Sequence, residues 1–244
     1  MDRPPEDAEA RRERLAAWAA EQERRIAPEG PGRPRPRGVL RRGVSNVIVA
    51  SLRCADRIFD RRLHTASEVR TAEHEHRDRV HYVPTPWHVL PRAFRFLRPS
   101  GDDTFVDFGC GKGRIVHQAA RWPLRRVIGV EISPELAEQA RAVVAAHRNQ
   151  YRCADIEIVV CDAAEYRVPD DMTVGFLYHP FTGETLDRVL QAVIDSIDRR
   201  PRRVRLIYVL LEGERRVLAT GRFRHLKDLR SGMPFVRVVI FEST

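Results

Sequence analysis

The chain has 244 residues and a formal net charge of +9, which is enough for one α/β domain of ordinary size with an extension. Its four cysteines form no CxxC pair, which argues against both a zinc ribbon and a disulfide framework. No apolar run approaches the roughly 20 residues of a membrane span, and the charged amino terminus does not resemble a signal peptide. We therefore expect a cytoplasmic protein.

The positive charge consists almost entirely of arginine, since only Lys112 and Lys227 among the 43 basic residues are lysines. With the abundant alanine, this skew is typical of a GC-rich genome, and we expect a bacterial source. The arginines are scattered and do not alternate with aromatic residues as they do in single-strand binding modules. The composition therefore favours solvated faces over a nucleic-acid groove, and we expect neither a nucleic-acid nor a membrane partner.

The first hundred residues divide into two predicted parts. Residues 1–42 join an Ala/Glu/Arg stretch to the sequence PEGPGRPRPRG, whose prolines and glycines break any regular element, so they are predicted to form a flexible extension. Residues 43–100 are predicted to form a helical segment that covers the site of the main domain. Its helices are expected after Ser45, a good N-cap residue, and from about Trp87.

Residues 101–244 alternate short apolar strands with amphipathic helices. Strands are predicted at 104–108, 126–131, 156–161, 173–178 and 203–210, and helices at 112–121, 134–147 and 183–197. This alternation indicates βαβ units with right-handed crossovers and a parallel sheet. The last two strands, 221–228 and 235–242, are separated by a turn too short for a helix, so they are predicted to form an antiparallel hairpin.

The sequence VDFGCGKGR, from Val106 to Arg114, ends the first strand and opens the first helix of this region. Ligands bind at that place in open α/β sheets. Gly109, Gly111 and Gly113 allow positive φ and let the backbone approach a ligand closely. A tight turn without a ligand is the alternative interpretation.

Two features of this loop argue against a dinucleotide. The glycine spacing is GxGxG, whereas the pyrophosphate fingerprint is GxGxxG. Asp107 also places a carboxylate at the mouth of the loop, which repels a pyrophosphate and attracts a ligand that carries an ammonium and a sulfonium group. A GxxxxGK[ST] phosphate loop is excluded as well, because Lys112 is followed by Gly113 and Arg114.

The motif DFGCGKG, with Glu131 at the end of the next strand and Asp162 beyond the third, resembles class I S-adenosylmethionine-dependent methyltransferases. The resemblance covers about residues 82–244. It implies a Rossmann-like, seven-stranded α/β sheet, mostly parallel with an antiparallel carboxyl-terminal hairpin and with helices on both faces.

The resemblance also implies S-adenosyl-L-methionine as the cofactor. Asp107 is expected to attract the methionine ammonium, Glu131 to bind the ribose hydroxyls, and Asp162 to lie near the adenine amino group. The complete set of implied cofactor-binding residues is Asp107, Gly109, Gly111, Gly113, Glu131, Ile132, Asp162 and Ala163.

Two residues are candidates for catalysis. His179 lies in FLYHPF at the end of the fourth strand, where many relatives that methylate nitrogen carry Asn or Asp before proline. A histidine there can act as a general base, or it can cap the following helix. Tyr82 lies in YVPTP, a segment that resembles those folding over the cofactor in several protein-lysine methyltransferases, and the alternative is a plain connector.

No metal is expected, because the HxH pair His74 and His76 has no further ligands at recognisable spacing. We expect an enzyme that transfers a methyl group to an oxygen or nitrogen of a small molecule or a protein side chain. A nucleic-acid methyltransferase and a non-catalytic cofactor-binding or RNA-binding module are the alternatives.

Overall fold

The structure is a computed structural model, which describes residues 85–178, 181, 183–209, 213–230 and 237–244. The predicted extension at 1–42 and most of the predicted helical segment at 43–100 lie outside these residues. Among the helices of the described ranges, none is both long and apolar enough to cross a membrane.

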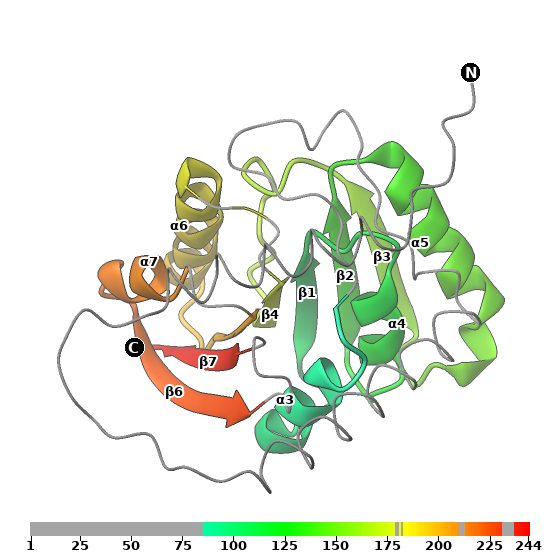
Figure 1. The fold of residues 1–244 in the computed structure, drawn as a ribbon, viewed down its shortest axis with the longest axis horizontal. Helices are drawn as coiled ribbons and strands as arrows, with labels where there is room; N and C mark the ends of the chain where they lie inside the picture. The colour runs from blue at the N-terminus through cyan, green and yellow to red at the C-terminus, as the bar shows by residue number, and fades with distance from the viewer. Residues whose placement is uncertain (1–84, 179–180, 182, 210–212, 231–236) are drawn as a thin grey trace, which may run out of the picture.

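A seven-stranded sheet forms the centre of the described chain (Figure 1), with the strand order β3-β2-β1-β4-β5-β7-β6. The first five strands pair in parallel, and β7 is antiparallel to both of its neighbours, β5 and β6. The strands are β1 (Thr104–Phe108), β2 (Arg126–Glu131), β3 (Asp155–Val160), β4 (Met172–Tyr178), β5 (Arg205–Val209), β6 (Phe223–Arg230) and β7 (Arg237–Ser243). The Rossmann-like sheet with its antiparallel terminal hairpin is thus confirmed.

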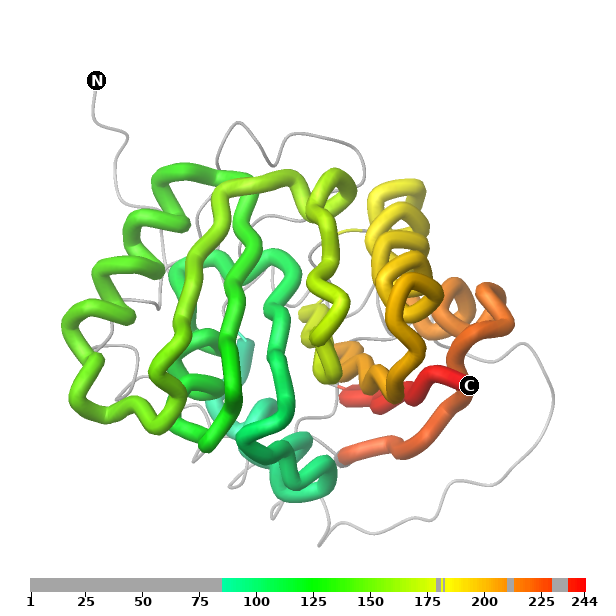
Figure 2. The backbone as a smooth tube through the Cα atoms, turned by 180° about the vertical axis from the view of Figure 1, so that it is seen from behind, coloured from blue at the N-terminus to red at the C-terminus, as the bar shows by residue number. Residues whose placement is uncertain are grey.

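Helices cover both faces of this sheet, as the burial of its apolar residues requires. One cluster of buried residues joins α3, α4 and α5 to one face, and a second joins α6 and α7 to the other. Figure 2 shows the same layers from behind, with β3 beside α5 at one edge of the sheet and β6 at the opposite edge. The helices are α3 (Val89–Leu97), α4 (Arg114–Ala120), α5 (Pro134–Ala146), α6 (Gly183–Arg199) and α7 (Glu214–Ala219).

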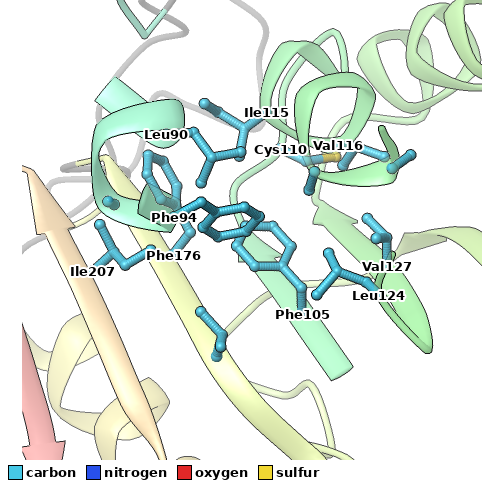
Figure 3. Close-up of a cluster of buried hydrophobic side chains, with 14 of the residues drawn as sticks. Leu90, Phe94, Phe105, Cys110, Ile115, Val116, Leu124, Val127, Phe176 and Ile207 are labelled. Atoms are coloured by element: carbon cyan, nitrogen blue, oxygen red, sulfur yellow. The ribbon is translucent and has the colours of Figure 1, made fainter. Parts of the chain in front are cut away.

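Strand β1 alternates its side chains between the two faces. Phe105 points into the first cluster, whereas Val106 and Phe108 belong to the second, and all three are fully buried. Figure 3 shows Phe94 of α3 packed against Phe105, with ring centroids 5.5 Å apart in an edge-to-face arrangement. This contact fixes α3 beneath the strand that leads to the glycine loop.

The ends of several elements are shifted by one or two residues from the predicted bounds, and two differences have a clear physical reason. Helix α4 begins at Arg114 rather than near Lys112, because Gly113 has a φ of 78° and a left-handed residue cannot start an α-helix. Helix α7 was not predicted, since it has six residues and only Val217 among them is buried, which leaves too short an apolar pattern to detect.

Candidate functional site

The carboxyl ends of β1, β2 and β3 are joined by backbone hydrogen bonds. The amides of Gly109 and Cys110 both donate to the carbonyl of Val130, at 2.9 Å. The amide of Cys161 donates to the carbonyl of Glu131, also at 2.9 Å. The three segments expected to bind the cofactor lie at the ends of three different strands. These hydrogen bonds therefore bring them together at the carboxyl end of the sheet.

The loop after β1 needs its glycines for backbone geometry. The φ angles of Gly109, Gly111 and Gly113 are 81°, 53° and 78°, a region that residues with a Cβ rarely occupy. Gly113 has a second reason to be glycine, because a Cβ there would lie 2.9 Å from the Cβ of Ala140 on α5. Its absence lets α4 and α5 pack closely.

Glu131 is the central acid of the site. Its side chain is buried, and its carboxylate accepts hydrogen bonds from the amide of Gly111 at 2.7 Å and the amide of Ser133 at 3.0 Å. Glu131 thereby ties the glycine loop to the residues that begin α5.

Asp107 lies within β1, between Gly129 of β2 and Phe176 of β4. It is buried to 3% exposure, and no residue of the described chain forms a hydrogen bond or an ion pair with its carboxylate. Burial, and secondarily the negative charge of Glu131, raises the pKa of the Asp107 carboxyl well above its ordinary value. A cationic ligand would stabilise the ionised form of this buried carboxylate.

The remaining implied cofactor residues lie beside Glu131. Ile132 is half-buried directly after it, and Ala163 is buried two residues beyond Cys161. Asp162 is half-buried, and its Oδ1 accepts a hydrogen bond from the amide of Ala164 at 3.0 Å. The Asp162 side chain is thus held in a local turn at the site's edge, and its role toward adenine stays a prediction.

Arg114 belongs to this region, although sequence reasoning gave it no role. It is buried to 3% exposure at the start of α4, and its Nη1 donates to the carbonyl of Thr85 at 2.7 Å. Its guanidinium lies 5.3 Å from the ring centroid of Trp87. In the sequence, the only hint that Arg114 belongs to the site is its position directly after the third glycine. Its contact with Thr85 joins residues that are 29 positions apart, so it could not be predicted from the sequence.

The two catalytic candidates, Tyr82 and His179, lie outside the described residues. The structure describes their neighbours: Tyr178 ends β4 and is half-buried, and Phe181 is buried in the cluster beneath α6. His74 and His76 lie outside the described residues as well. Within the described ranges, His, Cys, Asp and Glu nowhere gather in a group of three that could hold a metal ion.

These residues fit a ligand with a positive charge and hydroxyl groups. Two buried carboxylates, Asp107 and Glu131, meet at the loop, and their charge disfavours a pyrophosphate. The loop itself brings three glycine backbones to the same edge. The arrangement suits S-adenosyl-L-methionine, whose methionine end carries an ammonium and whose ribose carries two hydroxyls.

Comparison with known proteins agrees with this geometry. Residues 105–199 match a family model described as a methyltransferase domain. A stretch of 64 residues is 42% identical to a protein-lysine N-methyltransferase from Saccharolobus islandicus, and it represents 26% of this chain. The match spans only 40% of the length of that curated relative.

Solved structures of low sequence identity are similar as well. An RNA methyltransferase from Salinibacter ruber, in complex with S-adenosyl-L-homocysteine, is 22% identical with a TM-score of 0.49, over 66% of this chain and 93% of that one. An rRNA methylase from Streptococcus thermophilus is 14% identical with a TM-score of 0.47, over 66% of this chain and 98% of that one.

The strand order, the carboxylates around the glycine loop and the family match all describe the same domain. Its cofactor is S-adenosyl-L-methionine. The chain contains a methyltransferase domain, which the family model matches over residues 105–199.

Proposed function

We propose that the protein transfers a methyl group from S-adenosyl-L-methionine to the side-chain amine of a lysine in a protein acceptor. The cofactor supplies an electrophilic methyl group, so the chain has to bind it, orient it and admit a neutral amine. The observation that carries the cofactor half of the proposal is the pair of buried carboxylates, Asp107 and Glu131, at the glycine loop.

Each carboxylate has a distinct part in this proposal. Asp107, which lacks a partner among the described residues, accepts the ammonium of the methionine end. Glu131 accepts from the ribose hydroxyls while its bonds to Gly111 and Ser133 keep the carboxylate oriented. Because Asp107 is only 3% exposed, the attraction is stronger there than it is between exposed charges.

The acceptor half of the proposal is supported by sequence. The relative from Saccharolobus islandicus is a protein-lysine N-methyltransferase, and the choice of acceptor rests on its 42% identity over 64 residues. We propose His179 as the base that takes the proton of the lysine ammonium, since it directly follows β4. Tyr82 is proposed to orient the methyl group or the amine.

The direct test is methyl transfer from tritiated S-adenosylmethionine to the proteins of a cell extract. The full chain is expected to label protein, the label is expected to survive nuclease digestion, and acid hydrolysis is expected to release ε-methyllysine. Prior acetylation of all acceptor amines should abolish the label, because an amide nitrogen is not nucleophilic enough to accept the methyl group. Asp107→Asn, assayed in parallel at a subsaturating cofactor concentration, is expected to label about tenfold less protein or lower still.

Three outcomes would overturn this proposal in different ways. Label that disappears with nuclease indicates a nucleic-acid acceptor. Label that persists after the amines are blocked indicates another side chain or a small molecule. Cofactor binding without transfer to any acceptor indicates a binding module.

A further inference from the structure

Arg114 joins the start of α4 to the chain that enters the domain. Its Nη1 donates to the carbonyl of Thr85 at 2.7 Å, and both residues are buried. A guanidinium presents a rigid fork of donors, so a bond to a backbone carbonyl fixes direction as well as distance. Burying an arginine is costly unless its donors are used, which makes this contact costly to lose.

Trp87 completes the contact. The Arg114 guanidinium lies over its ring at 5.3 Å from the centroid, and the His117 ring meets it edge-on at 6.0 Å. Mainly because of burial, the pKa of His117 is lowered to about 4, so the imidazole is neutral at pH 7 and does not repel the guanidinium. Residues of one face of α4 thus hold a single tryptophan.

The anchored segment continues directly into α3. The amide of Val89 donates to the carbonyl of Pro86 at 3.1 Å, which makes a turn ahead of the helix. Farther along α3, Phe94 packs edge-to-face on Phe105 of β1 and on Trp122. The entering segment is therefore fixed at both ends, to the sheet through Phe94 and to the glycine loop through Arg114.

We propose that Arg114 is a positioning residue for cofactor binding: it locks residues 85–87 onto the first turn of α4 and so holds that turn, and Gly113 before it, in the binding arrangement. The inference rests on the proposed function for its cofactor.

The test compares Arg114→Gln and Arg114→Lys with Arg199→Lys in the full chain. Arg199 is a matched control, since it also donates to a backbone carbonyl, that of Val168 at 2.9 Å, but from α6 on the opposite face of the sheet. Hydrogen exchange of the amides of residues 87–90 is measured without cofactor, and calorimetry measures affinity for S-adenosylmethionine.

Arg114→Gln is expected to speed exchange of these amides and to weaken cofactor binding about tenfold or more. Arg114→Lys is expected to lie between Gln and wild type, because the ammonium keeps its charge over Trp87 but loses the planar fork. Where transfer is measured, Arg114→Lys should raise the KM for the cofactor and leave kcat within about twofold. Arg199→Lys should change neither exchange nor affinity.

The inference is overturned if the wild type binds the cofactor and both Arg114 variants exchange and bind as it does. It is also overturned if the Lys variant loses only thermal stability while its affinity is unchanged, since that is a purely structural role. Should the Gln variant fail to fold, the Lys variant decides the question. No cofactor binding by the wild type overturns both proposals, whereas binding without methyl transfer overturns only the proposed function.

Discussion

Two buried aspartates at opposite ends of β1 differ in their hydrogen-bond partners. Asp103, just before the strand, is 7% exposed, and its carboxylate accepts from Arg205 at 2.8 Å, from the Thr173 hydroxyl at 2.7 Å and from the amide of Ser100 at 2.7 Å. Asp107, within the strand, is 3% exposed and has no such partner in the described ranges.

The difference separates stability from function. Three hydrogen-bond donors offset the free-energy cost of removing a carboxylate from water. A buried carboxylate without donors instead lowers the stability of the fold. The acid at the amino end of β1 therefore stabilises the fold, whereas the acid at the carboxyl end is expected to bind the ligand. Substitutions at the two ends should consequently affect different measurements.

The largest effect is expected from Asp103→Ala. It leaves Arg205, Thr173 and the amide of Ser100 without their acceptor, and the free energy of unfolding should fall by about 3 kcal/mol. Urea denaturation measures this loss. The folded variant should bind S-adenosylmethionine normally, and a loss below about 1 kcal/mol would contradict the contrast between the two ends.

Asp107→Asn should show the opposite pattern. Without the carboxylate, the ammonium loses a desolvated counter-charge, and cofactor affinity should fall by about 1.5 to 3 kcal/mol, tenfold or more. The free energy of unfolding should not decrease, because the residue removed is a buried acid without a partner among the described residues. Asp102→Asn, an exposed acid at the amino end of the strand, is the control and should bind as the wild type does.

Glu131→Ala is expected to weaken cofactor binding by about 1 to 3 kcal/mol, since ribose hydroxyls lose a charged acceptor. Glu135→Ala is its matched control, because Glu135 is an exposed acid in the first turn of α5. Calorimetric titration of both variants gives the comparison. Equal affinities would show that Glu131 does not bind the ligand.

The smallest effect is a dependence on pH. Because burial raises the Asp107 pKa in the folded state, the native protein keeps this proton to higher pH than the unfolded chain does. The contribution of Asp107 to stability should therefore decline as the pH rises from about 4 toward the raised pKa. Cofactor affinity should rise through the same window.

Calorimetry in buffers of different ionisation enthalpy checks this expectation. Below the raised pKa, binding should release a proton, and Asp107→Asn should abolish the release. Proton uptake in the wild type, or a release that the Asn variant retains, would assign the titration to another group.

Much of the fold was predictable because local patterns and chain connectivity agree. Apolar strands alternating with helices leave little choice but a parallel sheet, and the missing helix before the last strand forces an antiparallel hairpin. The order β5-β7-β6 was not predicted from the residues themselves, since a hairpin can add to a sheet by either of its strands. The class resemblance implied only that the final strand is antiparallel.

The candidate site was predictable for a similar reason. Gly109 follows β1, Glu131 ends β2 and Asp162 lies just beyond β3. Neighbouring parallel strands bring their carboxyl ends together at the same end of the sheet. The catalytic candidates Tyr82 and His179 lie outside the described residues and stay predictions.

The sequence by itself determined which elements form and which of their ends carry the chemistry, because both depend on short-range periodicity and on the direction of parallel strands. Only the tertiary structure decided which buried groups find partners. Asp103 pairs with Arg205 across 102 residues, Arg114 reaches back 29 residues to Thr85, and Gly113 makes room for α5. Those contacts follow from packing, and packing joins residues whose separation along the chain leaves no local pattern.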